Sequence, residues 1–249
     1  MHIIYKKIGE TSLEALKRFR KEAGKLEETL SYAGRLDPMA SGQLLLLEGE
    51  ENDRRDDFLD LDKNYEFSIL FGATTDTFDL LGLVELAENT DLPLTVNRLN
   101  EVLQSFIGKW EMVYPPYSAQ TIAVDGKKIP LWQLARANCL PSNLPTKDVE
   151  VYEASCMEIT EITTEDVLNY IETNIPKVSG DFRQEEIIAR WQQVLADADK
   201  PLQLAHCSVS GSAGLYVRRL AYEVGSKLSC PSLAFSIDRT AIDVPENLI

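Results

Sequence analysis

The apolar residues of this chain show two kinds of spacing, which together predict both strands and helices. Residues 43–47, four of them leucine, form a largely apolar run between Gly42 and Gly49, and such a run is typical of a strand buried on both faces. In residues 65–71, tyrosine, phenylalanine and isoleucine alternate with polar residues, which is the pattern of a half-buried strand. Further strands are expected at residues 3–5, 149–159, 206–209 and 233–237.

The apolar side chains of residues 13–23 have helical spacing, and Thr11, which precedes them, is suited to capping a helix. Residues 114–128, with Pro-Pro and Asp-Gly pairs, indicate an ordered loop or hairpin that could close over a ligand. Other helices are predicted at residues 99–107, 164–175, 183–195 and 214–228. The acidic, polar region of about 160–200 is interpreted as a helical insertion within a single domain.

Length and charge narrow the class of protein. A chain of 249 residues with 44% hydrophobic content can bury a substantial core within one domain. The 40 acidic residues exceed the 25 Lys and Arg residues, and the net charge of -15 argues against a general nucleic-acid coat protein. Any RNA contacts must therefore be local. No stretch approaches the roughly 18 apolar residues of a membrane span, and the N-terminus has no cleavable hydrophobic core, so we expect a cytoplasmic protein.

The cysteines and histidines offer few candidates for catalytic or metal-binding residues. Cys139, Cys156, Cys207 and Cys230 form no Cys-x-x-Cys pair, which argues against a zinc ribbon or a disulfide framework and favours reduced, mostly buried thiols. The two histidines leave little basis for a histidine metal site or a Ser-His-Asp triad. We therefore expect no metal, and the chemistry must come from other side chains.

Asp37 lies in a segment whose backbone is shaped by its neighbours. Because it precedes Pro38, Asp37 is pushed into an extended conformation, while Gly34 and Gly42 permit turns on either side. Taken alone, an Asp-Pro pair is typical of a simple turn. An aspartate-nucleophile phosphatase would need a second aspartate two residues after the first, and Met39 stands there instead.

Four motifs in chain order, made up of five segments, carry a family resemblance. Residues 34–42 read Gly-Arg-Leu-Asp-Pro-Met-Ala-Ser-Gly, and residues 63–65 and 75–82 read Lys-Asn-Tyr and Thr-Asp-Thr-Phe-Asp-Leu-Leu-Gly. Residues 115–119 read Pro-Pro-Tyr-Ser-Ala, and residues 214–220 read Gly-Leu-Tyr-Val-Arg-Arg-Leu. In this order they resemble the catalytic loop, the Lys-x-Tyr strand with its turn, the thumb loop and the arginine motif of the TruB family of pseudouridine synthases, which modify uridine in the T-loop of tRNA.

The resemblance covers nearly the whole chain except the insertion, with three departures. Tyr32 stands where the family has a histidine, so a base contact there would be made by stacking. Because the sequence ends shortly after the expected core, we expect no room for the small C-terminal RNA-binding domain that many members carry. The strong acidity and the insertion at about 160–200 suggest a divergent lineage with its own substrate range or a partner on that surface.

The resemblance implies an α+β pseudouridine synthase fold, with a mixed, mostly antiparallel central sheet flanked by helices, in a single catalytic domain of residues 1–249. The implied reaction is the isomerisation of uridine to pseudouridine, at uridine 55 of the tRNA T-loop. The chemistry requires no cofactor, and we expect a monomer that binds the tRNA stem-loop.

The same resemblance assigns roles to individual residues. Asp37 would attack a flipped-out uridine at base C6 or ribose C1′, and Arg218 would pair with Asp37 and stabilise its charge. Tyr65 would stack on the base, and its hydroxyl is a candidate to relay the C5 proton. Further substrate contacts are expected from Tyr32, Ile237, Arg35, Lys127 and Lys128.

Other interpretations fit parts of the sequence. A non-catalytic RNA-binding or tRNA-folding module could use the same cleft, although binding alone does not require Asp37, Tyr65 and Arg218 together. An acidic interaction domain would explain the net charge but none of the four motifs. Asp76 and Asp79 are interpreted as carboxylates that cap their own turn rather than as catalytic groups.

Overall fold

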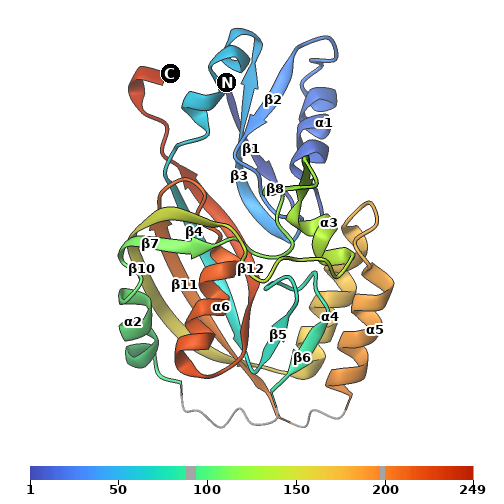
Figure 1. Cartoon of the computed structure of the whole chain (residues 1–249), viewed down its shortest axis with the longest axis vertical. Coiled ribbons are helices and arrows are strands. Elements are labelled where there is room, and N and C mark those ends of the chain that lie inside the picture. Colours follow the sequence, from blue (N-terminus) through green and yellow to red (C-terminus); the bar gives the residue numbers. More distant parts are fainter. Residues whose placement is uncertain (88–93, 197–199, 249) are drawn as a thin grey trace.

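A mixed eight-stranded sheet forms the centre of the protein (Figure 1). The computed structural model describes residues 1–87, 94–196 and 200–248. Strands β3 and β12 pair in parallel, and the other pairs of this sheet are antiparallel. The strand order is β1 (His2–Lys6), β3 (Ala40–Glu48), β12 (Ser232–Ile242), β4 (Lys63–Phe71), β11 (Leu202–Gly211), β10 (Thr146–Ile162) and β7 (Gly108–Val113), with β2 (Leu30–Ala33) also paired to β3. The expected α+β fold with a mostly antiparallel sheet is confirmed.

Helices cover both faces of this sheet, and two short hairpins stand beside it (Figure 1). The hairpins are β5 (Ala73–Thr75) with β6 (Val84–Leu86), and β8 (Thr121–Val124) with β9 (Lys127–Pro130). The helices are α1 (Ser12–Glu22), α2 (Val96–Gln104), α3 (Leu131–Arg136), α4 (Thr164–Asn174), α5 (Gln184–Leu195) and α6 (Val217–Leu228), with 3-10 turns η1 (Gly49–Phe58), η2 (Ile175–Lys177) and η3 (Glu246–Leu248).

Strand β4 shows why one expectation about the sheet is wrong. The alternation in residues 65–71 predicts one exposed face, yet residues 67–71 are all buried. Ile69 belongs to an apolar cluster that includes residues of α2 and α6, whereas Leu70 belongs to a second cluster that includes residues of α4 and α5. The second face is therefore covered by helices that follow β4 by about a hundred residues in the chain, which local periodicity does not reveal.

Helix ends follow local capping chemistry. Helix α1 begins at Ser12 because the Thr11 side chain accepts the backbone N–H of Glu14, and the Glu14 carboxylate in turn accepts the Thr11 N–H, a capping box. Helix α6 begins at Val217, three residues later than predicted, and Gly214 has φ +89°, outside the helical region. The predicted hairpin is present and turns at Asp125 and Gly126, which both have positive φ.

The structure bears on the expected state of the cysteines and on the expectation about membrane spans. The four cysteines are free thiols; three are buried and Cys139 is exposed. Among the helices in the described part of the chain, none has both the length and the apolar character required to cross a membrane.

Candidate active site

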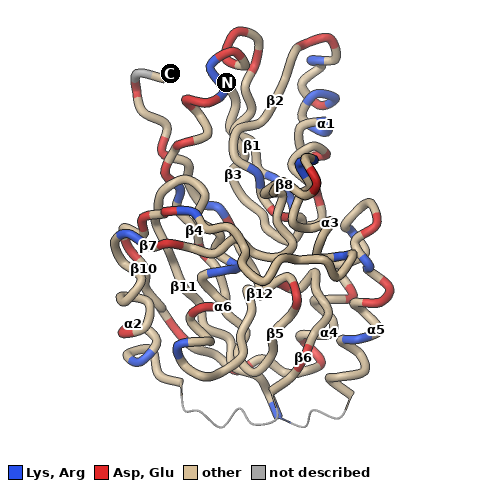
Figure 2. The backbone as a smooth tube through the Cα atoms, in the orientation of Figure 1, with Lys and Arg blue, Asp and Glu red and all other residues tan. Residues whose placement is uncertain are grey.

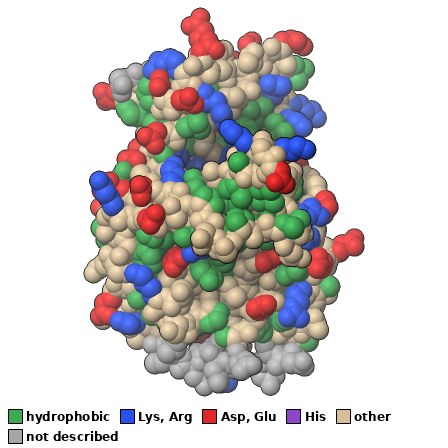
Figure 3. Space-filling model, viewed as in Figure 1, with side chains coloured by type: hydrophobic (Ala, Val, Ile, Leu, Met, Phe, Trp, Pro, Cys, Tyr) green, Lys and Arg blue, Asp and Glu red, His purple; other side chains and the backbone are tan. Residues whose placement is uncertain are grey.

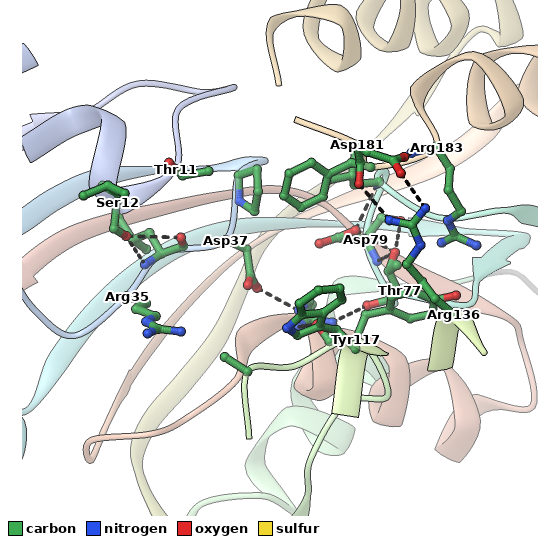
Figure 4. Close-up of a pocket in the computed structure, with 18 of the residues that line it drawn as sticks. Thr11, Ser12, Arg35, Asp37, Thr77, Asp79, Tyr117, Arg136, Asp181 and Arg183 are labelled. Carbon is green, nitrogen blue, oxygen red and sulfur yellow. Dashed lines mark hydrogen bonds and ion pairs between the residues drawn. The ribbon is translucent and has the colours of Figure 1, made fainter. Parts of the chain in front are cut away.

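A cavity of about 650 Å³ lies where several segments of the chain meet (Figure 4). Its walls are the start of α1, residues 35–38, the turn that contains Thr77 and Asp79, the loop and helix between 117 and 136, and residues 181–183. Figure 3 shows that this face of the molecule is hollowed, with Lys and Arg side chains at the margin of the hollow. The cavity brings together four residues singled out in the sequence: Tyr32, Arg35, Asp37 and Arg218.

Asp37 and Arg218 form an ion pair at the cavity wall. The Nε of Arg218 donates to Oδ2 of Asp37 at 2.7 Å, and the side chains are 2% and 36% exposed for Arg218 and Asp37 respectively. The other guanidinium nitrogens donate to two backbone carbonyls, that of Thr77 at 2.6 Å and that of Tyr117 at 3.0 Å. Every nitrogen of the buried guanidinium is therefore engaged, and the carboxylate remains accessible from the cavity.

The charge of Arg218 is stabilised by its surroundings. Burial acts to lower the pKa of Arg218, but the negative charges of Asp37 and Asp79 outweigh it and raise that pKa above its ordinary value. The arginine is thus a fixed cation that can hold a carboxylate in one orientation.

The loop that carries Asp37 is held by hydrogen bonds from the N-terminal segment. The hydroxyl of Ser12 accepts the backbone N–H of Leu36 at 3.1 Å and lies 3.4 Å from the Leu36 carbonyl. The backbone N–H of Gly9 donates to the carbonyl of Pro38 at 2.9 Å. Lys6, fully buried, donates to the same Pro38 carbonyl at 3.3 Å and to the carbonyl of Ala40. The backbone on the C-terminal side of Asp37 therefore has little freedom.

Arg239 holds the other side of the loop. Its Nε donates to the carbonyl of Gln43 at 2.7 Å, and its terminal nitrogens donate to the carbonyls of Gly34 at 3.3 Å and Arg35 at 3.4 Å. Lys6 was not recognised as a site residue because the carbonyls it binds, those of Pro38 and Ala40, are more than thirty residues away in the chain.

Asp76 and Asp79 cap their turn, as predicted. Oδ1 of Asp79 accepts from the Thr77 hydroxyl at 2.7 Å and from the Leu81 N–H at 2.9 Å, while Oδ1 of Asp76 accepts from the Leu83 N–H at 2.9 Å. Asp79 also borders the cavity. Burial, together with the nearby charge of Asp37, raises the pKa of Asp79 to about 6, although Arg218 acts in the opposite direction.

Tyr65 and Ile237 lie apart from the cavity wall. Tyr65 is buried in an apolar cluster that also contains Leu36, and Ile237 packs against the same cluster. Burial raises the pKa of Tyr65, with the nearby Arg239 acting to lower it. The predicted contact of Tyr65 and Ile237 with a base stays a prediction. Such a contact would be made at the apolar cluster next to the catalytic loop rather than in the open cavity.

Lys127 and Lys128 are exposed on β9 and do not line the cavity. Figure 2 shows Asp and Glu distributed along the chain with Lys and Arg between them. The basic side chains that line the cavity are Arg35, Arg136, Arg183 and Arg218. Arg35 is exposed at the cavity beside Asp37. Among the described residues, no group of three His, Cys, Asp or Glu side chains is arranged as metal ligands would be.

Several residues at the cavity were missed in the sequence. Asp181, Phe182 and Arg183 come from the region interpreted as an insertion, and Trp132 comes from α3. In Figure 4, Asp181, Arg136 and Arg183 lie on the side of the cavity opposite Ser12 and Arg35. In the sequence, this polar, acidic stretch has the composition of solvent-exposed surface. Its position at the cavity is apparent only in the folded chain.

Solved structures show the same fold. One is a Cbf5-Nop10-Gar1 complex, matched with a TM-score of 0.55 and 16% identity over 96% of this chain and 48% of that one. Another is an H/ACA ribonucleoprotein bound to a substrate RNA containing 2′-deoxyuridine, with a TM-score of 0.53, 15% identity and coverage of 99% and 50%. At these identities, the likeness shows the fold alone.

Sequence comparison defines the family. Residues 21–175 match the model of the TruB family pseudouridylate synthase N-terminal domain. The tRNA pseudouridine synthase B of Protochlamydia amoebophila is 31% identical over 239 residues, which cover 96% of this chain and 72% of that protein. The corresponding protein of Cupriavidus metallidurans is 30% identical over 242 residues, covering 96% and 61%. The chain belongs to the TruB family of pseudouridine synthases, a family of isomerases, as the four motifs predicted.

Proposed function

We propose that this protein converts uridine to pseudouridine in the T-loop of tRNA, at uridine 55, with Asp37 as the nucleophile. The observation that carries the proposal is the ion pair between Asp37 and Arg218 at the wall of a cavity of about 650 Å³. A cavity of this volume is large enough for a nucleotide extruded from a stacked loop. The proposal places the enzyme in the cytoplasm, as a monomer.

The reaction requires that one bond to the ribose is exchanged for another. The C1′–N1 bond of the uridine breaks, the base turns within the pocket, and a C1′–C5 bond forms while N1 gains a proton and C5 loses one. Asp37 would form a covalent intermediate by attacking either C1′ of the ribose or C6 of the base. Both routes need an ionised carboxylate held at a fixed place.

Arg218 would hold the carboxylate of Asp37 in that position. Because its remaining nitrogens are held by the carbonyls of Thr77 and Tyr117, it cannot swing towards an RNA phosphate and leave Asp37 unpaired. The carboxylate therefore keeps one orientation before the substrate enters, and such preorganisation lowers the barrier of the chemical step.

The RNA contacts follow from what surrounds the cavity. Extruding a base costs roughly a few kcal/mol, and stacking on an aromatic ring returns about 1–3 kcal/mol per base. Tyr32 at the cavity can stack, and Arg35 beside it can meet a phosphate. A base inserted next to Asp37 would reach the cluster of Tyr65 and Ile237 through its border at Leu36.

Release of tritium from tRNA tests the proposal. A transcript carrying tritium at uridine C5 is incubated with the wild type and with Asp37→Asn, which keeps the size of the side chain and removes the nucleophile. We expect release with the wild type alone, binding by both proteins, and loss of release when the T-loop uridine is replaced by cytidine. If neither protein releases tritium while both bind the transcript, the protein is an RNA-folding module and the proposal is wrong.

A further inference from the structure

Residues 178–184, which we call the η2–α5 connection, belong to the acidic region between β10 and β11, and three of them, Asp181, Phe182 and Arg183, form one wall of the cavity. Gln184 fixes the shape of this connection: its side chain accepts the backbone N–H of Phe182 at 2.9 Å and donates to the carbonyls of Val178 and Gly180, each at 2.7 Å. The connection is therefore an ordered turn rather than a loose surface loop.

The helices on either side of the connection are anchored in the core. Trp191 of α5 is fully buried, and it lies in an apolar cluster with Ile171 of α4, Leu70 of β4 and Met39 of the catalytic loop. Movement of this helical pair would disturb the loop that carries Asp37, so the connection has a defined position relative to the site.

Arg183 is the residue of the connection that contacts both Asp76 and Tyr117. It adopts the left-handed conformation, with φ +63°, which is unusual for a residue with a side chain and is often found at functional sites. Its terminal nitrogens bind both carboxylate oxygens of Asp76, at 2.8 and 3.3 Å, and its guanidinium carbon lies 4.7 Å from the centre of the Tyr117 ring. The side chain is only 16% exposed.

These two partners belong to the backbone segments that hold Arg218. Asp76 directly precedes Thr77, whose carbonyl accepts one guanidinium nitrogen of Arg218, and the carbonyl of Tyr117 accepts another. Arg183 thus joins the turn at residues 75–79 to the loop at residue 117, and both segments orient the arginine that holds Asp37.

We propose that Arg183 is a positioning residue, which binds Asp76 and Tyr117 together so that the carbonyls of Thr77 and Tyr117 hold Arg218 against Asp37. This inference rests on the proposed function, because its effect is on the chemical step. A second contact supports it: Asp181 of the same connection binds Arg136 at the end of α3, at 2.7 Å, and so ties the connection again to the segment that follows Tyr117. The acidic helical region would then serve the active site directly.

Single-turnover kinetics on the C5-tritiated tRNA transcript separate this role from binding. Arg183→Met removes the guanidinium but keeps an apolar stem, and we expect the single-turnover rate constant at saturating protein to fall about 10- to 100-fold, because small misplacement of a catalytic group has effects of this size. The Kd for the transcript should change less than about twofold. Arg183→Gly tests the same loss with a residue that adopts positive φ without strain, so a folding defect of the first variant does not decide the result.

The matched control is Arg190→Met on α5, the helix that directly follows Arg183. Arg190 donates from Nε to the carbonyl of Val84 at 3.1 Å, and so contacts the same β5–β6 hairpin without reaching Asp76 or Tyr117. We expect its single-turnover rate constant to equal that of the wild type. In a double-mutant cycle, Asp76→Asn combined with Arg183→Met should be no slower than the slower single variant, because both changes remove the same ion pair between Arg183 and Asp76.

The outcomes distinguish the two proposals. If the wild type releases no tritium, the proposed function fails and this inference fails with it. If the wild type is active, the inference is overturned by an unchanged rate constant in both Arg183 variants, by a loss confined to the Kd, or by an equal fall in Arg190→Met, which would indicate general loosening of α5.

Discussion

Arg218 and Asp37 are 181 residues apart in the chain and meet through one contact, from Nε to Oδ2 at 2.7 Å. The pair is asymmetric, because the arginine is buried and the aspartate is partly exposed to the cavity. The arginine is bound on three sides, by one carboxylate and two carbonyls, while the aspartate has an accessible carboxylate. The structure thus separates the residue that orients from the residue that can react.

Replacing Arg218 by lysine should therefore be nearly as harmful as removing it. A lysine can bind one of the three acceptors well but cannot match the planar geometry of a guanidinium. We expect Arg218→Lys and Arg218→Met each to lower the single-turnover rate at least about 100-fold, and to lower the free energy of unfolding by about 2–3 kcal/mol because buried carbonyls lose their donors. Urea unfolding and tritium release measure both. A lysine variant with wild-type rate would show that charge alone is sufficient.

Asp79→Asn should change how stability depends on pH. The pKa of Asp79 is raised to about 6 by burial, from an ordinary value of 3.8, so between these values the folded state binds more protons than the unfolded state. Wild-type stability therefore falls as pH rises through this window, whereas asparagine has no such titration. As the pH rises from 4 to 7, the free energy of unfolding of the variant should increase by up to about 3 kcal/mol relative to that of the wild type. Parallel stability curves from urea unfolding at several pH values would contradict this assignment.

Lys6→Met should loosen the catalytic loop and also reveal a titration. Lys6 holds the carbonyls of Pro38 and Ala40, so its loss should lower the rate about tenfold by freeing the backbone next to Asp37. Burial lowers the pKa of Lys6 to about 8 from 10.5, so between these values the unfolded state binds more protons. Wild-type stability should therefore rise relative to the variant from pH 8 to pH 10.5. Thermal unfolding across this range checks the sign, and a difference that is constant with pH would refute it.

Lys127 and Lys128 should matter for affinity more than for chemistry. Both are exposed on the β8–β9 hairpin and lie outside the cavity wall. If they contact phosphates, the double variant Lys127→Gln, Lys128→Gln should bind the tRNA transcript more weakly, and the dependence of log K on log salt should become shallower by about one to two. The rate at saturating protein should change less than the affinity. An unchanged salt dependence would place these lysines outside the RNA interface.

Local chemistry in the sequence determined much of the fold and the nucleophile candidate. Thr11 and Glu14 define the start of α1, the leucine run identifies β3, and the Asp125-Gly126 pair defines a hairpin, because capping, burial of a continuous apolar run and positive φ are properties of a few adjacent residues. The segment around Asp37 and the later arginine motif were recognisable for the same reason, since their order along the chain is itself a signal.

Tertiary structure alone decided what surrounds that aspartate. The covering of the second face of β4 and the contacts of Lys6, Arg239 and Arg183 all join residues distant in the chain, and several of them end on backbone carbonyls, which every residue carries. A polar side chain that binds a remote carbonyl has the same local pattern as one that faces water. The wall contributed by residues 181–183 therefore became visible only when packing of α4 and α5 brought that connection to the cavity.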